Sequence, residues 1–539
     1  MSEQIPSNLA RVPPSVPPGI NPWFIAVTVT IAAFMELLDT SIANVALPHI
    51  GGGLGHSYDE VTWILTTYLV ANAVVLPMSA WLSRLMGRKN YYLLCVLLFT
   101  VSSLLCGLAP SLGLMLFFRV LQGIGGGGLA PVAQAILVDT FPPAKRATAF
   151  ALFTVVIVTA PAIGPVLGGW ITDSYNWRWI FFINVPVGLL ALYLSNKFIH
   201  DPHTFTTERT LAHAQGRMSV DGVGIVLIAL ASAALEVSLD RGQIEDWFAS
   251  NFIVAMLAIA LVGWIGTVLW ELHVRDPIID VRLLSNRNFA IGSVLFFVLG
   301  ISLFGTTTLI PQMLQSLYGY RAIDAGLVLG PGALVITLLS PVCAQLLQRH
   351  IVSAKVLALL SLSFIGLSMF VYSNMNLDTN GSHYAWERAI QGVGYGLFFV
   401  PVNIIAYSHL RPDQNNKASS LTNLFRNWGG SFGIAFATTA VERRENLHQM
   451  NLGSHLGSSS QSLQQSAQSM VERLMQHGLT SADAGPAALG LLHQQLIRQS
   501  TFLAFMDCFR VIGWLTFAMI PLVLMLRKFK VGVGAPAGH

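Results

Sequence analysis

Charged residues are scarce in this sequence. Lys and Arg number 30 and Asp and Glu 26 among 539 residues, so only 10% of the chain is charged, against roughly a quarter in a soluble domain. The hydrophobic fraction is 53%. A soluble fold of this composition would expose an apolar surface and aggregate, and disorder requires the opposite composition. The shortage of charge therefore indicates an integral membrane protein.

Other features that the sequence lacks exclude several classes of function. The four cysteines lie in apolar runs without CxxC spacing, which argues against a disulfide framework or a zinc site. A net charge of only +4 makes nucleic acid an unsuitable partner. The sequence has no HExxH or phosphate-loop motif, so we expect neither an enzyme nor a bound cofactor.

The apolar residues are gathered into runs of the length that crosses a membrane as a helix. A spanning helix needs about 20 largely apolar residues, and the runs lack the short alternation of barrel strands. The sequence predicts an all-α membrane protein with fourteen spans, numbered here in chain order: 22–46, 61–83, 91–110, 112–137, 147–170, 179–199, 221–239, 251–270, 289–314, 324–347, 353–373, 384–408, 419–440 and 505–526.

Basic residues predict the orientation of these spans. Nineteen of them fall on the side of the two termini, whereas three fall in short loops on the opposite side. Because short cytoplasmic loops collect Lys and Arg, we expect both termini in the cytoplasm and a multi-pass protein of the cell inner membrane. The long loop 441–504, rich in Gln, Ser and His, then lies outside, either as a docking surface or as a mobile solvated loop.

A motif occurs twice. Residues 117–131 read FFRVLQGIGGGGLAP and residues 386–401 read WERAIQGVGYGLFFVP, so Arg119 and Arg388 begin the same Arg-x-x-Gln-Gly-x-Gly-x-Gly pattern in spans 4 and 12. Two halves repeated in the same orientation are typical of a transporter. The predicted organisation is a tail (1–21), an N-terminal six-helix bundle (22–199), a linker with two extra spans (200–288), a C-terminal six-helix bundle that includes the loop 441–504 (289–526), and a second tail (527–539).

Several motifs carry a resemblance to a known family. They are LDTSIANVALP (38–48), RVLQG (119–123), APAIGPVLGG (160–169), WIFFINVPVG (179–188) and LDRGQIEDWF (239–248). Over nearly the whole chain the sequence resembles the major facilitator superfamily, specifically its fourteen-span drug:proton antiporters of the EmrB/QacA type. The last two motifs, with PPAKR (142–146), are most similar to the EmrB multidrug efflux transporters.

The resemblance implies a fold of two six-helix bundles plus two inserted helices, and export driven by the proton gradient. It also implies a tripartite pump, with a periplasmic adaptor of the EmrA type and an outer-membrane channel of the TolC type. One motif departs from the family. The loop between spans 2 and 3 reads AWLSRLMGRK (80–89), which keeps Gly87 and Arg88 for gating but has Arg84 where the family's charge relay has aspartate.

Three charged residues inside spans are the predicted proton-coupling group. Asp39 lies nine residues before Pro48, roughly 13 Å along span 1, and Arg119 lies roughly 10 Å from the outer end of span 4, so the two can pair. Glu36 lies one turn before Asp39. Burial favours the neutral form of a carboxyl group, whereas a nearby arginine favours its charged form. The alternative is that Asp39 and Arg119 are purely structural.

A drug cavity is mostly apolar with a few polar groups. The residues predicted to bind drug are the polar and aromatic side chains of the spans: Gln122, Gln134, Asn184, Asn72, Tyr68, Phe182, Gln391, Asn403 and Arg426. In span 5, Pro165 removes a helical donor and glycines allow close helix packing. The predicted antiporter hinge is Gly164, Pro165, Gly168 and Gly169.

The predicted function is proton-coupled efflux of hydrophobic or amphipathic drugs by alternating access, with protons, drugs and membrane lipids as small partners. The alternatives are a dedicated exporter of one natural compound, such as a siderophore or fatty acid, and a membrane sensor that transports nothing. Charges buried in two repeated halves favour transport over a static receptor.

Overall fold

The computed structural model describes residues 21–201, 221–274, 277–408, 410, 414–454 and 461–527. The predicted tails 1–21 and 527–539 lie outside these residues except for Asn21 and Arg527. Every element in the described ranges is a helix, as predicted. The elements are α1 (Pro22–Leu54), α2 (Tyr58–Val61), α3 (Trp63–Met86), α4 (Arg88–Leu108), α5 (Leu112–Gly126), α6 (Leu129–Thr140), α7 (Pro143–Ser174), α8 (Trp179–Phe182), α9 (Asn184–Phe198), α11 (Gly222–Arg241), η2 (Trp247–Ala249), α12 (Asn251–His273), η3 (Val281–Ser285), α13 (Arg287–Tyr318), α14 (Ala322–Gln348), α15 (Ala354–Tyr372), α16 (Gly381–Gly396), α17 (Phe399–Tyr407), α18 (Asn415–Ser454), α19 (Gln461–Gln476), α20 (Ser481–Phe517) and α21 (Ile520–Leu524).

Within the described residues, twelve helical segments are long and apolar enough to cross a membrane, and the bent helix α7 makes a thirteenth. The bend of 41° in α7 separates Lys145–Pro161 from Ile163–Ser174. Proline lacks the N–H that would bond to the preceding turn, so a helix bends there. The sequence predicts Pro165 as the flexible point, whereas the structure places the bend one turn earlier, at Pro161.

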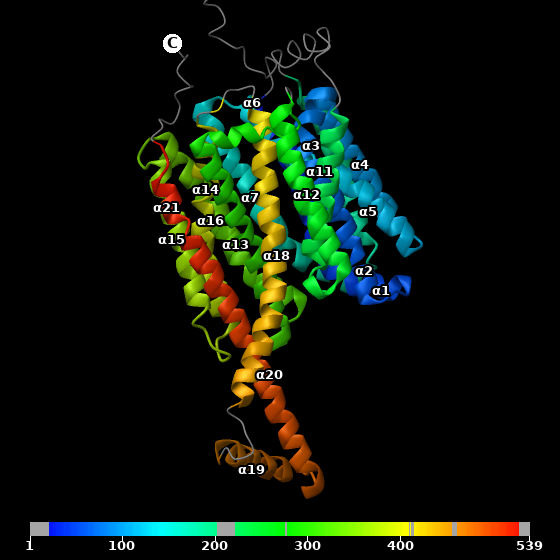
Figure 1. The fold of residues 1–539 in the computed structure, drawn as a ribbon, viewed down its shortest axis with the longest axis vertical. Coiled ribbons are helices and arrows are strands. Elements are labelled where there is room, and N and C mark those ends of the chain that lie inside the picture. The colour runs from blue at the N-terminus through cyan, green and yellow to red at the C-terminus, as the bar shows by residue number, and fades with distance from the viewer. Residues whose placement is uncertain are drawn as a thin grey trace, which may run out of the picture.

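The predicted span 419–440 lies within α18. This helix runs the length of the body in Figure 1, but it is more polar than the twelve helical segments counted above and is not one of them. The part of α18 that corresponds to the predicted span, 419–440, carries polar residues, of which Asn423 and Arg426 are buried. α18 is thus a polar helix enclosed by apolar neighbours.

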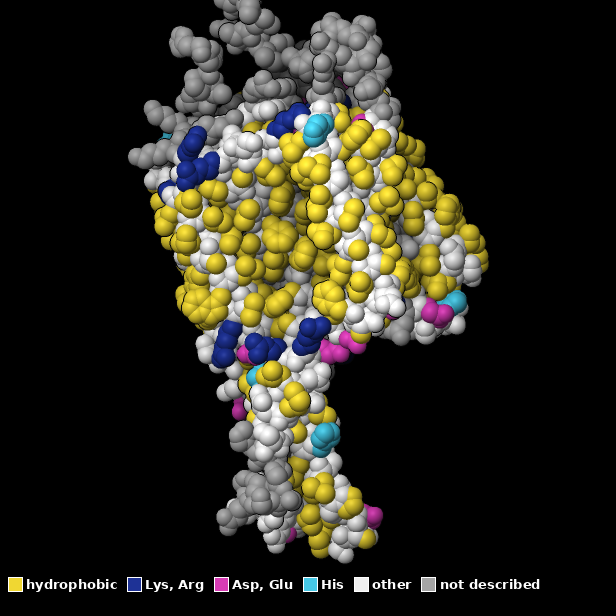
Figure 2. Space-filling view, in the orientation of Figure 1, with side chains coloured by type: hydrophobic (Ala, Val, Ile, Leu, Met, Phe, Trp, Pro, Cys, Tyr) yellow, Lys and Arg dark blue, Asp and Glu magenta, His cyan; other side chains and the backbone are white. Residues whose placement is uncertain are grey.

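The helices form two bundles, α1–α9 and α13–α21, with α11 and α12 beside them (Figure 1). α7 packs against α14, and α3 and α6 pack against α18, so these contacts join the two bundles. α11 lies against α3, α12 and α18. Figure 2 shows one face of the resulting surface, where a broad apolar band of yellow side chains crosses the body and suits contact with lipid.

The repeated motif serves the same packing purpose in both bundles. A side chain at Gly123 would meet the α3 backbone at Tyr68, and one at Gly392 would meet the α14 backbone at Gly332. Gly125 and Gly394 likewise lie against α4 and α15. The glycines let equivalent helices approach closely, which explains why the motif occurs twice.

The segment 441–504 is largely helical. α18 continues to Ser454, α20 begins at Ser481, and α19 packs against α20. Together they project from one end of the body (Figure 1). Because α18 and α20 each run from this projection into the C-terminal bundle without interruption, the stretch predicted as a long loop extends the bundle itself.

Candidate functional site

An ion pair is buried in the centre of the N-terminal bundle. Arg119 of α5 donates from Nη1 to Asp39 Oδ2 of α1 over 2.7 Å. Arg119 is fully buried and Asp39 is 2% exposed. A charge-assisted bond of this length is among the strong polar contacts of a protein interior. The depths estimated from the sequence predict that Asp39 and Arg119 can pair, and the structure shows that they do.

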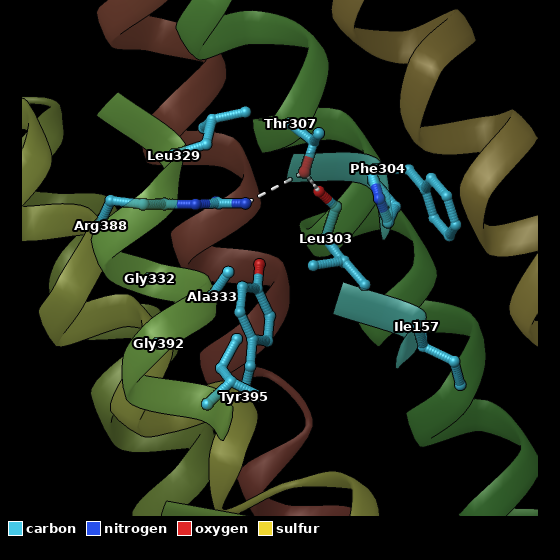
Figure 3. A pocket seen from close by; sticks show the side chains of 12 residues that line it. Ile157, Leu303, Phe304, Thr307, Leu329, Gly332, Ala333, Arg388, Gly392 and Tyr395 are labelled. Carbon is cyan, nitrogen blue, oxygen red and sulfur yellow. Dashed lines mark hydrogen bonds between the residues drawn. The ribbon is translucent and has the colours of Figure 1, made fainter. Parts of the chain in front are cut away.

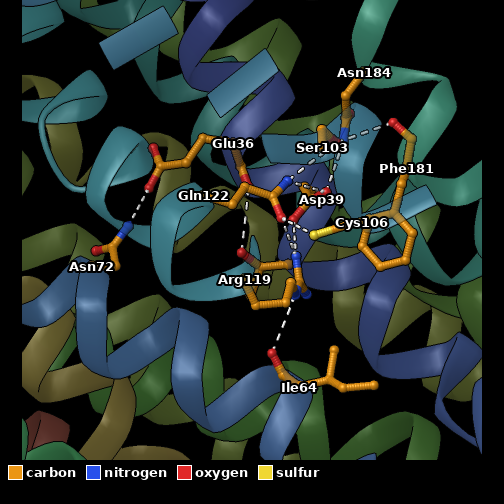
Figure 4. Close-up of polar contacts among 11 residues, drawn as sticks. Glu36, Asp39, Ile64, Asn72, Ser103, Cys106, Arg119, Gln122, Phe181 and Asn184 are labelled. Atoms are coloured by element: carbon orange, nitrogen blue, oxygen red, sulfur yellow. Dashed lines mark hydrogen bonds and ion pairs between the residues drawn. The ribbon is translucent and has the colours of Figure 1, made fainter. Parts of the chain in front are cut away.

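Two amides complete the surroundings of the carboxylate (Figure 4). Gln122 Nε2 and Asn184 Nδ2 donate to Asp39 Oδ1 over 3.0 Å and 2.6 Å. Both amides also donate to Ser103 Oγ of α4, over 3.2 Å and 2.9 Å. Four helices thus supply donors or acceptors to one network, and a change in the charge of Asp39 acts on all of them.

Arg119 is held from several sides. Its Nε donates to the carbonyl of Ile64 over 3.2 Å, and its Nη1 also donates to Gln122 Oε1 over 2.8 Å. The rings of Tyr68 and Phe181 lie 4.9 Å and 5.2 Å from the guanidinium carbon, at cation–π distance. Its Nη2 is buried without a hydrogen-bond partner among the described residues. The guanidinium therefore keeps one donor available inside the bundle.

Glu36 lies apart from this network although it is one turn away on α1 (Figure 4). Its Oε1 accepts from Asn72 Nδ2 over 3.1 Å, and its Oε2 has no partner among the described residues. Arg426 of α18, in the other bundle, attracts it electrostatically. Arg426 is 4% exposed, and its Nε also lacks a partner there. Glu36 and Arg426 thus belong to different bundles, and each has a buried atom without a hydrogen-bond partner among the described residues.

Gln134, predicted to bind drug, lies where the two bundles meet and joins them. Its Oε1 accepts from Asn423 Nδ2 over 2.7 Å and from Ser419 Oγ over 3.2 Å, both in α18. Ser79 and Ser420 are hydrogen-bonded over 2.8 Å at the same interface. These contacts close the end of the molecule opposite α19.

The C-terminal bundle contains the second copy of the motif. Arg388 Nη1 donates to Gln391 Oε1 and to Thr306 Oγ1, the latter over 2.9 Å. Gln391 Nε2 donates to the Tyr395 hydroxyl over 3.0 Å. Thr306 takes the position of a carboxylate, so the second network contains no acid.

The other predicted drug-binding residues lie elsewhere. Phe182 packs edge-on against Trp179 with ring centroids 5.7 Å apart, and the neighbouring Phe181 is the one that contacts Arg119. Asn403 is buried and donates to the carbonyl of Phe399 in its own helix over 2.9 Å. The structure therefore does not bring all the predicted residues into one cavity.

The predicted hinge residues lie where α7 meets α1. A side chain at Gly164 would overlap Ser41, and one at Gly168 would press on Ile42. Ser41 Oγ donates to the carbonyl of Pro161 over 3.0 Å, across the bend. Pro165 lies on the other side, beside Gly326 of α14, and Gly169 accepts from Thr172 Oγ1 over 3.1 Å. This part of α7 is thus packed between the two bundles.

The loop between spans 2 and 3 does contain an ion pair. Gly87 adopts a φ of 90°, which favours glycine, and turns the chain from α3 into α4. Arg88, 5% exposed, pairs with Asp139 near the end of α6. The motif lacks its own aspartate, and a carboxylate from a different helix takes its place.

Several residues of the site were not predicted from the sequence. Asp139 could have been found as an acid at the inner end of span 4, within reach of the Arg88 loop. Ser103, Ser419 and Asn423 gave no comparable signal, because small polar residues in spans commonly bond to their own helix. Among the described residues, no group of three His, Cys, Asp or Glu side chains is placed to hold a metal ion.

Comparisons with known proteins identify the family of the chain. The model of the Major Facilitator Superfamily matches residues 29–434. The chain is 34% identical over 517 residues to the multidrug export protein EmrB of Escherichia coli (strain K12), covering 95% of this chain and 97% of that one. It is 33% identical to the fatty acid resistance protein FarB of Neisseria gonorrhoeae, covering 96% and 98%.

A solved structure supports the fold. The human organic anion transporter MFSD10 superposes with a TM-score of 0.54 at 12% identity, covering 92% of this chain and 100% of that one. At this identity the likeness concerns the fold alone. With the family match over most of its length and two relatives of equal length above 30% identity, this chain belongs to the Major Facilitator Superfamily and is a membrane transporter homologous to the EmrB-type multidrug exporters.

Proposed function

We propose that the chain is a proton-driven exporter of hydrophobic or amphipathic compounds in the cell inner membrane. Both termini face the cytoplasm, and the α19 end faces outward. The proton gradient supplies the driving force and no cofactor takes part. The observation that carries the proposal is the buried Asp39 carboxylate held by Arg119 and two amides.

Protonation of Asp39 changes the energy of the whole network. The ionised carboxylate compensates the charge of Arg119, whereas the neutral acid leaves a buried guanidinium without a counter-charge, which costs several kcal/mol. The proton therefore favours a different arrangement of α1, α4, α5 and α9. A ligand that binds one arrangement better is then coupled to the proton, even though the two share no residue.

Glu36 and Arg426 connect this network to the other bundle. They belong to different bundles and attract each other electrostatically, and each has an atom without a hydrogen-bond partner among the described residues. A drug or water bound between them satisfies these atoms. Because Glu36 lies one turn from Asp39 on α1, binding at the interface and protonation at Asp39 act on the same helix.

The test is efflux from everted vesicles that contain the full chain. A fluorescent drug is loaded by an imposed pH gradient. Asp39→Asn should abolish gradient-driven transport, while Glu472→Gln, an exposed carboxylate of α19, should leave it unchanged. Drug counterflow without a gradient separates uncoupling from misfolding: it should survive in Asp39→Asn. Undiminished proton-driven efflux in that variant would contradict the proposal.

The projection formed by α18, α19 and α20 is the proposed contact for further pump components. By analogy with EmrB-type exporters, these are a periplasmic adaptor of the EmrA type and an outer-membrane channel of the TolC type. The support is that the projection extends beyond the apolar band (Figures 1 and 2), where a soluble partner can reach it.

The second candidate is a dedicated exporter of one natural compound. The observation in its favour is the 33% identity to FarB, which is named for fatty acid resistance. A substrate panel in a pump-deficient strain distinguishes the two: resistance to several unrelated drugs supports multidrug export, and resistance to a single chemical class supports dedicated export.

A further inference from the structure

Buried acidic residues occur in the N-terminal bundle and in the two inserted helices, and none occurs in the described part of the C-terminal bundle. Glu36 and Asp39 lie on α1, Glu236 on α11 and Glu271 on α12. The proposed function uses the first two. Glu271 lies near the end of α12, where it accepts from the backbone N–H of Ile278 over 2.9 Å. Glu236 is left as a buried acid to which no role has been assigned.

The C-terminal bundle lacks an acid in its own copy of the motif. Figure 3 shows Arg388 extending toward Thr307, to which its Nη2 donates over 3.0 Å. Its Nη1 donates to Thr306 and Gln391. All three acceptors are neutral, so a proton that reaches this motif meets no carboxylate. An acid for the C-terminal bundle has to come from a neighbouring element.

The inserted helix α11 supplies such an acid to α18. Glu236 is 5% exposed, and its Oε1 and Oε2 lie 2.9 Å and 3.1 Å from Ser431 Oγ. A serine hydroxyl has one hydrogen, so it donates to only one of these two oxygens. The other contact becomes a hydrogen bond when that oxygen carries a proton and donates it to Ser431. The geometry therefore fits a neutral carboxylic acid.

The charges around this contact do not compensate an ionised Glu236. Those within about two helical turns are Asp240 and Arg241 of α11 and Arg426 of α18, whereas the facing stretches of α3 and α12 carry none. Arg241 is bonded toward α3, and Arg426 attracts Glu36. Asp240, one turn along α11, repels Glu236. An ionised Glu236 is thus a buried charge without a counter-charge, which is costly.

α11 is bonded to both bundles. Thr66 of α3 donates to Asp240, and Arg241 Nη1 donates to Thr62 at the start of the same helix over 2.7 Å. On the other side, Glu236 is bonded to α18. One helix cannot keep its bonds to both bundles when the bundles move relative to each other. The surroundings of Glu236 therefore change during such a movement.

We propose that Glu236 is a second proton-binding residue of the export cycle and couples the inserted helix α11 to the movement of the bundles. A proton from the outer side binds one carboxylate oxygen and completes the pair of hydrogen bonds with Ser431. The same oxygen releases the proton toward the cytoplasm when α11 and α18 have separated. Because the bound proton favours one arrangement, protonation and movement are linked. The inference rests on the proposed export function and adds a proton to its stoichiometry.

The first experiment needs no drug. Infrared spectra are recorded on the purified full chain in nanodiscs at neutral pH. Wild type should show the carbonyl band of a neutral carboxyl group that Glu236→Gln lacks. Ser431→Ala should shift this band, because the hydrogen-bond partner of the acid is gone. Glu472→Gln, which removes an exposed carboxylate of α19, should leave the spectrum unchanged. A spectrum that neither Glu236→Gln nor Ser431→Ala alters would overturn the proposal.

The second experiment separates a proton-binding role from a structural one. In proteoliposomes with the membrane potential held at zero, the ethidium gradient that a given pH gradient just sustains is measured. Each coupled proton multiplies this drug gradient about tenfold per pH unit. Glu236→Gln should therefore sustain a roughly tenfold smaller ethidium gradient per pH unit than wild type, and Glu472→Gln should match wild type.

An ethidium gradient in Glu236→Gln equal to that of wild type contradicts the assignment, whatever the infrared spectra show. The two proposals fail separately. If Asp39→Asn abolishes gradient-driven transport while Glu236→Gln keeps the wild-type ethidium gradient, the export function stands and only the role of Glu236 is wrong.

Discussion

Asn423 of the C-terminal bundle donates a hydrogen bond of 2.7 Å to Gln134 of the N-terminal bundle. Ser419, one turn earlier in α18, donates to the carbonyl of Pro131 over 2.9 Å, and Gln348 donates to Thr148 over 2.6 Å near the same end. Neutral hydrogen bonds thus hold the two bundles together at the end of the molecule that lies away from α19. Such bonds are worth about 1 kcal/mol each, so they hold a closed state that a substrate can still open.

Asn423→Ala should open this end more often. Loss of one hydrogen bond of about 1 kcal/mol raises the open population roughly fivefold. Spin labels at Lys145 and Arg349, exposed on opposite bundles at this end, report the change as a longer distance. The four native cysteines are buried, so labelling is selective. Thr438→Ala, which removes a hydroxyl bonded within α18, is the control; an unchanged distance distribution in Asn423→Ala would refute the closure.

Gly164→Ala should reduce both stability and transport, because the added Cβ overlaps Ser41 of α1. Overpacking of this kind costs about 1–3 kcal/mol. Combining it with Ser41→Gly removes the overlap, so the double variant should be more stable than the sum of the single changes predicts. Melting temperature and dye efflux are the measurements. Gly113→Ala, which meets open space, should have no effect; additive losses would show that the contact is unimportant.

Asp139→Asn should destabilise the protein by removing the carboxylate that pairs with buried Arg88. A buried charge left without its partner costs roughly 3 kcal/mol, and the partial exposure of Asp139 (22% of its side chain) reduces this. A lower melting temperature in detergent is the readout. Charge reversal at both positions should recover part of the loss, whereas a wild-type melting temperature in Asp139→Asn would mean that the pair contributes little.

Replacing residues 455–480 by a short Gly-Ser linker removes α19 and leaves α18 and α20 intact. If the projection binds an adaptor, co-purification with an EmrA-type adaptor should be lost while the transporter stays monodisperse and binds drug. Glu472→Gln in α19 tests whether a single surface change has the same effect, and it should not. If the adaptor still binds after the replacement, α19 is not its contact site and the proposal is wrong on this point.

The sequence predicts position along a helix better than position around it. Each residue advances a helix by 1.5 Å, so the depths of Asp39 and Arg119 could be compared and their pairing anticipated. Which way a side chain points depends on helix rotation and on partners far away in the chain. For that reason the sequence does not indicate that the ring beside Arg119 is that of Phe181, or that Gln134 bonds to Asn423 of the other bundle.

Contacts between the bundles were also beyond prediction. Nothing in the local sequence indicates that Arg426 attracts Glu36, which lies almost 400 residues away. The polar stretch 441–504 was predicted as a long loop. Its continuity with α18 and α20 could not be inferred, because the hydropathy pattern ends where the membrane ends whereas the helices do not.

The continuity of α20 has a mechanical consequence. This helix runs unbroken from Ser481 to Phe517, 37 residues, or roughly 55 Å at 1.5 Å per residue. A tilt of the C-terminal bundle by about 10° would displace the far end of such a helix by roughly 10 Å. If the proposed transport cycle tilts this bundle, α19 moves with it, and a partner bound there would experience that displacement in each cycle.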